Sequence, residues 1–246
     1  MTSQTKSAAP ALVLLHFFGN SQGEWQRVTP MLSKRHRLLM FDMPGFGDAA
    51  EMGALDVSAM ADHVDQQIRS AGIEHCVVVG HSMTGKICGA LASRKPEYLR
   101  GLILVTPSPP PPEPFTDEVR KRLMAFDGSR EAAAAYVDGI TAEQLPDEWR
   151  EPAIADAMRA SLVAWKTWIS TTSQEDWSDR VGVLSLPVLV IAGADDPSLG
   201  ADIQRRLTMP HLGQGELRVI AGGHVLPLEN PQALIDAIES FGPCAA

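Results

Sequence analysis

The sequence has little cysteine and no pattern that would tie its cysteines together. Only Cys76, Cys88 and Cys244 occur in its 246 residues, widely spaced and without a C-x-x-C pair. An odd count at this spacing excludes a disulfide framework and a cysteine-based zinc site. Cys76 and Cys88 stand inside apolar runs and are expected to be small buried side chains. The sequence therefore favours the reducing cytoplasm.

Long apolar runs are also missing. No stretch approaches the roughly 20 apolar residues that a membrane span needs. The short run Ala11-Leu12-Val13-Leu14-Leu15 follows Lys6, but it is too short for a secretion signal and no cleavage site follows it, so a buried strand is expected. The formal net charge of −9 would be repelled by nucleic acid and by anionic membranes. We expect a small-molecule partner, and the sequence leaves a homo-oligomer open.

Signals for a metal or a cofactor are absent as well. Histidines and acids do not form an i, i+4 ligand pair in the context of an active site. Gly85-Lys86 lacks the upstream glycine and the following hydroxyl of a phosphate-binding loop. The sequence predicts no metal and no cofactor, and Lys86 is expected to point along its helix into solvent.

What the sequence does contain is an alternation of short apolar runs and amphipathic helical patterns. Such alternation is typical of a parallel sheet covered by helices, because its strands are buried on both faces. Helical stripes follow, one beginning after Asp56, which is placed to cap it, and another after Pro231. The expected strands are 12–17, 37–41, 76–79, 102–105, 188–191 and 217–220. The predicted fold class is α/β, with a mostly parallel sheet.

One segment breaks this alternation. After Ser108 the chain runs through a series of prolines, which stiffen a connector, and it then stays helical in pattern to about Val183. This segment also holds four of the five tryptophans. We expect residues 1–108 and 184–246 to form the core, and residues 109–183 to form a helical cap inserted into it.

A candidate nucleophile follows the third expected strand. In Gly80-His81-Ser82-Met83-Thr84-Gly85, the serine stands between a strand and a helical run. A serine on such a tight turn is exposed at the carboxyl end of the sheet, beside a helix N-terminus that favours negative charge. An ordinary turn with an incidental serine is the alternative, and the context favours Ser82 as the nucleophile.

A serine hydroxyl needs a base, and the base needs a carboxylate. Among the seven histidines, His224 follows the last expected strand in a glycine-rich turn and is the best candidate. Asp195 and Asp196 follow the strand before it, and we favour Asp196, with Asp195 as the alternative. The order Ser, Asp, His along the chain is the one expected for a hydrolase of this strand–turn–helix type.

The oxyanion of a tetrahedral intermediate needs N–H donors that are already in place. The backbone N–H of Met83, directly after the nucleophile, is one candidate. The second should come from the loop His16-Phe17-Phe18-Gly19 after the first strand, and we favour Phe18. The alternative for this loop is a purely packing role for its aromatic rings.

Together these motifs resemble the α/β-hydrolase superfamily, in particular its esterase, C–C hydrolase and cofactor-free haloperoxidase-like branch. The resemblance covers nearly the whole chain, including Asp42-Met43-Pro44-Gly45-Phe46-Gly47 after the second strand. It implies an eight-stranded type of sheet with a cap inserted after strand 102–105. Thr84 departs from the family's glycine, Phe17 departs from the glycine of its oxyanion loop, and the short N-terminus indicates reduced or missing first strands.

The expected activity is hydrolysis of a small, largely apolar carboxylic ester or lactone through an acyl-enzyme. A cap rich in tryptophan should enclose apolar ligands, so Trp165 and Trp168 are expected to contact substrate, and Phe17 to narrow the pocket. A C–C bond hydrolase and a cofactor-free perhydrolase would use the same three side chains. A ligand receptor of this fold is the alternative from another class of function.

Overall fold

A computed structural model describes residues 9–244 of the chain and shows a six-stranded sheet within them. All neighbouring strands are parallel, in the order β2-β1-β3-β4-β5-β6. The strands are β1 (Ala11–Leu15), β2 (Leu38–Met40), β3 (Cys76–His81), β4 (Leu99–Val105), β5 (Leu184–Gly193) and β6 (Leu212–Ile220). The predicted α/β class is confirmed, and the sheet within the described residues has six strands, fewer than the eight-stranded type.

The last two strands are longer than their apolar runs. β5 begins at Leu184 and β6 at Leu212, several residues before the expected starts at 188 and 217. β6 is an edge strand, and its Gln214 and Glu216 are exposed to solvent. An edge strand can extend through backbone pairing without burying its side chains, so apolar patterning underestimates its length.

Side chains of the central strands alternate between two apolar layers, as the pleat of a strand requires. Val13 and Val78 pack in one layer, and Leu14 and Val79 pack in the other. Helices α2 (Val57–Ser70) and α3 (Met83–Ser93) cover the first layer, and α1 (Thr29–Leu32) and α11 (Pro231–Glu239) cover the second. The expected cap of α2 is present, since the Asp56 carboxylate accepts the N–H of Ala59 at 2.7 Å.

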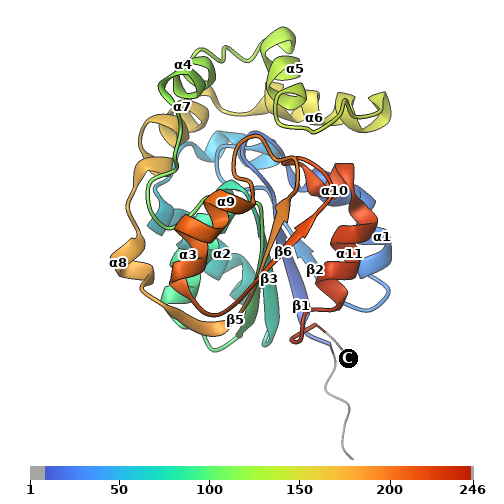
Figure 1. The fold of residues 1–246 in the computed structure, drawn as a ribbon, viewed down its shortest axis with the longest axis vertical. Coiled ribbons are helices and arrows are strands. Elements are labelled where there is room, and N and C mark those ends of the chain that lie inside the picture. Colours follow the sequence, from blue (N-terminus) through green and yellow to red (C-terminus); the bar gives the residue numbers. More distant parts are fainter. Residues whose placement is uncertain (1–8, 245–246) are drawn as a thin grey trace, which may run out of the picture.

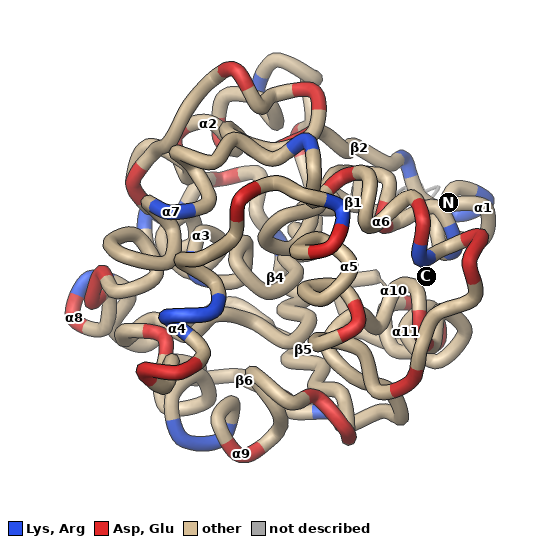
Figure 2. The backbone as a smooth tube through the Cα atoms, turned by 90° about the horizontal axis from the view of Figure 1, so that it is seen from above, with Lys and Arg blue, Asp and Glu red and all other residues tan. Residues whose placement is uncertain are grey.

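The chain between β4 and β5 is helical, and we call residues 109–183 the cap segment. Most of this segment lies above the sheet in Figure 1, and acidic and basic residues are interspersed along it when seen from above in Figure 2. Its helices are α4 (Asp117–Met124), α5 (Arg130–Asp138), α6 (Asp147–Arg159), α7 (Leu162–Ser170) and α8 (Ser178–Val181). The helical character of the segment agrees with the sequence pattern, while the exact domain boundaries stay a prediction.

Candidate active site

Ser82 occupies the sharp turn between β3 and α3. Its backbone has φ 52° and ψ −114°, a strained conformation for a residue with a Cβ atom. Two glycines allow the close packing around this turn, because a Cβ on Gly80 would collide with Cys88 and one on Gly85 would collide with Pro107. The strain places the serine hydroxyl at the carboxyl end of the sheet, where the sequence predicted it.

Thr84 stands where the family resemblance led us to expect glycine, and the turn accommodates it. The side chain is fully buried, and its hydroxyl accepts the N–H of His81 at 2.8 Å. The same hydroxyl can donate to the carbonyl of Leu15, 3.1 Å away, or to that of His81, 2.9 Å away. Thr84 therefore ties the turn to β1, and the glycine required by close packing is Gly85 instead.

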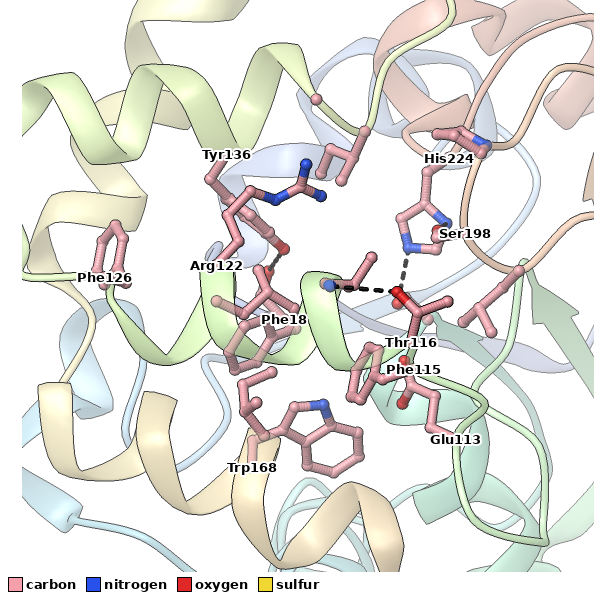
Figure 3. Close-up of a pocket in the computed structure, with 18 of the residues that line it drawn as sticks. Phe18, Glu113, Phe115, Thr116, Arg122, Phe126, Tyr136, Trp168, Ser198 and His224 are labelled. Atoms are coloured by element: carbon pink, nitrogen blue, oxygen red, sulfur yellow. Dashed lines mark hydrogen bonds between the residues drawn. The ribbon is translucent and has the colours of Figure 1, made fainter.

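Ser82, His224 and Asp196 form one hydrogen-bonded chain. The Ser82 hydroxyl donates to Nε2 of His224 over 2.8 Å, and Nδ1 of His224 donates to the Asp196 carboxylate, also over 2.8 Å. Because a carboxylate only accepts, this geometry assigns the proton of the neutral imidazole to Nδ1 and leaves Nε2 free to take a proton from serine. Figure 3 shows the ring of His224 on the wall of a cavity.

The loop after β5 distinguishes the two candidate acids. The Asp196 side chain is fully buried, and its second oxygen accepts the N–H groups of Ser198 at 2.8 Å and Leu199 at 3.1 Å. Asp195 is exposed and does not contact His224. The arrangement therefore brings together the three residues that the sequence favoured and leaves the alternative acid in solvent.

Burial and mutual attraction act in opposite directions on this pair. Burial raises the pKa of Asp196, but the charge and hydrogen bond of His224, together with the N–H groups of Ser198 and Leu199, lower it more, so its pKa lies below the usual range. Burial lowers the pKa of His224, but the charge and hydrogen bond of Asp196, together with the charges of Glu113 and Glu229, raise it more, so its pKa lies above the ordinary 6.5. The pair therefore favours an ionised Asp196 and stabilises the imidazolium that forms when His224 takes a proton.

Of the two expected oxyanion donors, Met83 directly follows the serine and Phe18 lines the same cavity as Ser82. Within residues 9–244, neither the N–H of Met83 nor that of Phe18 donates to a protein acceptor. Phe18 is fixed on both sides: Tyr136 donates its hydroxyl to the Phe18 carbonyl at 2.7 Å, and the N–H of Phe17 donates to Glu24 at 3.2 Å. Both N–H groups therefore have no protein acceptor among the described residues, and their role as an oxyanion hole stays a prediction.

A second buried pair, which the sequence did not reveal, supports this arrangement. His81 lies between the Glu24 carboxyl, 3.1 Å from its Nδ1, and the carbonyl of His224, which accepts from its Nε2 at 2.8 Å. Both side chains are buried, and the other Glu24 oxygen holds the N–H of Phe17. The pair therefore connects the oxyanion loop, the nucleophile turn and the loop that carries His224.

Glu229, in α10 (Leu226–Glu229), supports the base from the other side. Its carboxylate accepts the N–H groups of Gly223 and Val225, both at 2.9 Å, which flank His224. It also accepts the N–H of Ala142 from the cap segment at 2.8 Å. No sequence pattern marked this acid, because its three partners are backbone groups from two separate parts of the chain.

The position expected for Lys86 is wrong. Its side chain is buried rather than solvated, and its ammonium donates to the carbonyls of Pro111 (3.0 Å), Ser173 (2.8 Å) and Glu175 (2.9 Å). Burial lowers its pKa to about 8, while nearby Glu113 and Glu175 act to raise it. The cap segment folds back over α3, and its first and last stretches surround the ammonium that the helix alone would have left in water.

Above the catalytic groups lies a cavity of about 480 Å³. Its walls come mostly from the cap segment and include Trp165 and Trp168, the two tryptophans expected to contact substrate. Phe17 is not among the lining residues, and its ring packs against His81 at a centroid distance of 5.1 Å. Phe18 takes the cavity side instead, 4.4 Å from the ring of Trp165. Phe17 is therefore not placed to contact a substrate in this cavity.

Residues 9–244 contain no group of three or more His, Cys, Asp or Glu side chains able to hold a metal ion. Their helices are also all too short or too polar to cross a membrane.

The chain is similar to esterases and to a bromoperoxidase. A pimeloyl-acyl-carrier-protein methyl ester esterase of Aeromonas hydrophila is 25% identical over 243 residues, which cover 94% of this chain and 95% of that protein. An esterase of Exiguobacterium antarcticum superposes with a TM-score of 0.83 at 17% identity, covering 95% of this chain and 92% of that one. A bromoperoxidase of Bacillus anthracis superposes with a TM-score of 0.86 at 17% identity, covering 95% and 91%.

The two structural likenesses show the fold, because their sequence identity is low. A family model described as the alpha/beta hydrolase family matches residues 12–237. This range includes the edge strands β2 and β6 and the hydrogen-bonded residues Ser82, Asp196 and His224. The chain belongs to the alpha/beta hydrolase family.

Proposed function

We propose that the protein hydrolyses a small, largely apolar carboxylic ester or lactone through an acyl-enzyme on Ser82. The observation that carries this proposal is the Ser82–His224–Asp196 chain, with 2.8 Å between its members at each step, at the floor of an apolar cavity. The similarity to the Aeromonas methyl ester esterase supports an ester as the substrate class.

In the first half-reaction, the Ser82 oxygen attacks the ester carbonyl while His224 takes the serine proton at Nε2. The oxyanion accepts the N–H groups of Met83 and Phe18. Collapse of the intermediate breaks the bond to the alcohol, and His224 returns the proton to the departing oxygen. Asp196 holds the Nδ1 proton throughout and stabilises the imidazolium.

In the second half-reaction, water takes the place of the alcohol. His224 accepts a proton from this water, which attacks the acyl carbonyl and forms a second oxyanion in the same site. Collapse releases the carboxylic acid, and the proton on His224 passes to Ser82. For a lactone, the alcohol and the acid are the two ends of a single product.

Replacing either reacting residue tests the proposal. Ser82→Ala and His224→Ala should each lower ester turnover by roughly 10⁴- to 10⁶-fold, because the nucleophile or its base is lost. Turnover is measured on esters and lactones of graded chain length, with Asp195→Asn as the matched surface control. Activity close to wild type in either purified alanine variant would refute the mechanism.

The other activities open to the same residues are separated by substrate and by labelling. A C–C bond hydrolase would prefer a vinylogous diketone to every ester, and a perhydrolase would show peroxide-dependent halogenation in carboxylate buffer. A fluorophosphonate probe tests the receptor alternative, because a serine without an active base is not labelled. Labelling of the wild type but not of Ser82→Ala is expected.

A further inference from the structure

Two buried polar side chains of the cavity wall have no part in the mechanism proposed above. Glu113 and Trp168 both line the cavity, and both are almost completely buried, with exposed fractions of 8% and 2%. Most of the remaining wall is aromatic or aliphatic. Polar atoms facing an apolar cavity are costly unless something pairs with them, so these two groups indicate what the cavity binds.

Glu113 keeps one carboxyl oxygen without a protein partner. The Ser108 hydroxyl donates to its Oε2 at 2.9 Å, and within residues 9–244 no donor lies in hydrogen-bonding distance of Oε1. Lys86 does not supply one, because its ammonium already donates to three carbonyls. Burial raises the pKa of Glu113, and the Ser108 hydroxyl and the charge of Lys86 offset part of that rise.

Trp168 presents the complementary group. Within the described chain, its indole N–H donates to no acceptor, whereas the neighbouring Trp165 donates its own to the carbonyl of Leu123 at 2.8 Å. Among the described residues, the side-chain polar atoms that are both unpaired and fully buried belong to Trp25, His36 and Glu239. The Trp168 N–H is unpaired but is not fully buried. Because Trp168 is 2% exposed and lines the cavity, its N–H opens into the cavity.

Glu113 is linked to the nucleophile through Ser108, and Trp168 lines the same cavity as Ser82. Ser108, which holds the Glu113 carboxyl, also donates its N–H to the carbonyl of Ser82 at 2.9 Å. In Figure 3, Glu113 and Trp168 lie on the same side of the cavity, across from His224 and the Tyr136 end. A substrate that filled the cavity with its carbonyl at Ser82 would therefore meet a carboxyl and an indole N–H on the cavity wall.

We propose that Glu113 and Trp168 determine specificity by binding a hydroxyl group on the substrate, so that the preferred substrates are hydroxy esters or hydroxy lactones. A hydroxyl both donates and accepts, so it can pair with the Glu113 carboxyl and with the Trp168 N–H. A plain alkyl chain would displace water from both groups and leave them unpaired, and this unpaired burial would weaken the binding of a substrate without a hydroxyl. This inference rests on the ester hydrolase activity proposed above and narrows its substrate class.

Matched pairs of esters test the proposal. Each pair has the same alcohol and the same chain length, and one member carries a single hydroxyl at successive positions of the acyl chain. The wild type should prefer the hydroxylated member by roughly 10- to 100-fold in kcat/KM at one position at least. Glu113→Leu and Trp168→Phe should each bring that ratio close to one, whereas Glu113→Gln should keep part of it, because an amide still forms hydrogen bonds.

The control variant is Glu118→Gln, which changes an exposed carboxyl that does not line the cavity and should leave the ratio as in the wild type. Trp168→Phe preserves the packed ring, so the test remains valid if Glu113→Leu does not fold. A wild-type ratio near one at every position would overturn the proposal and show that water alone occupies these groups. A preference that survives in both Glu113→Leu and Trp168→Phe would overturn it equally.

Labelling separates this result from failure of the esterase activity itself. Fluorophosphonate labelling of Ser82 together with ester turnover, but without a hydroxyl preference, contradicts only the specificity. Absence of labelling contradicts the proposed function. If no ester in the panel turns over but Ser82 is labelled, the same comparison is made with alkyl and hydroxyalkyl phosphonates, and equal labelling rates would overturn the specificity.

Discussion

Replacing Asp196 by asparagine should remove most of the activity while leaving the fold intact. One Asp196 oxygen accepts the N–H groups of Ser198 and Leu199, and the other faces Nδ1 of His224 at 2.8 Å. In Asp196→Asn, the amide oxygen should stay with the two N–H donors, so the NH₂ group must face His224. Nδ1 then has to accept, and the imidazole proton moves to Nε2, where it blocks transfer from Ser82.

The expected loss is about 10⁴-fold in kcat/KM, which corresponds to roughly 5 kcal/mol of transition-state stabilisation. It is measured with an activated aryl ester under second-order conditions, and unfolding in urea checks that the variant is folded. Asp195→Asn is the matched control, since Asp195 is exposed, and it should retain at least about half of the activity. A loss below tenfold in Asp196→Asn, or an equal loss in Asp195→Asn, would refute the assignment of the acid.

Two further results are expected. The kcat/KM of the wild type should fall as the pH is lowered, with an apparent pKa above 6.5. Asp196 raises the pKa of His224, and only neutral His224 accepts a proton. A pH–rate profile with its midpoint below 6.5 would contradict the pairing of His224 with Asp196. Glu24→Ala should lower the free energy of unfolding by about 3–5 kcal/mol, because it leaves His81 and the N–H of Phe17 without their buried partner. Urea denaturation measures this loss, and Glu24→Gln is the shape-matched control. A loss under about 1 kcal/mol in Glu24→Ala would contradict the prediction.

The sheet and the position of the nucleophile could be predicted because both depend on local pattern. Buried parallel strands are continuous apolar runs, and a serine between a strand and a helix with glycines around it indicates a strained turn. The places of His224 and Asp196 followed from the rule that parallel strands end at the same edge of a sheet. These inferences required only that the strands lie side by side.

The polar groups that hold this site together could not be predicted in the same way. Lys86 lies on α3, but its burial depends on where the cap segment returns, and its partners are carbonyls that any residue type carries. Glu24 and His81 are 57 residues apart, and their pairing depends on two loops meeting. Hydrogen bonds between distant loops leave no periodic signal in a sequence.

The loop after β1 shows the same limit on a smaller scale. Phe17 and Phe18 are adjacent and chemically identical, yet one packs against His81 and the other lines the cavity. Which ring faces the substrate depends on how the loop turns, and the turn is fixed by Glu24 and Tyr136 from outside the loop. Sequence identified the loop but not the direction of its side chains.

The central claim is that an oxygen of Ser82 becomes covalently bound to the substrate while two backbone N–H groups hold the oxyanion. A crystal structure of the protein inactivated with an alkyl phosphonate tests it most directly. We predict phosphorus bonded to Ser82 Oγ, with the phosphonyl oxygen about 2.7–3.1 Å from the nitrogens of Met83 and Phe18. Phosphorus on another residue, or a phosphonyl oxygen directed away from both nitrogens, would contradict the claim.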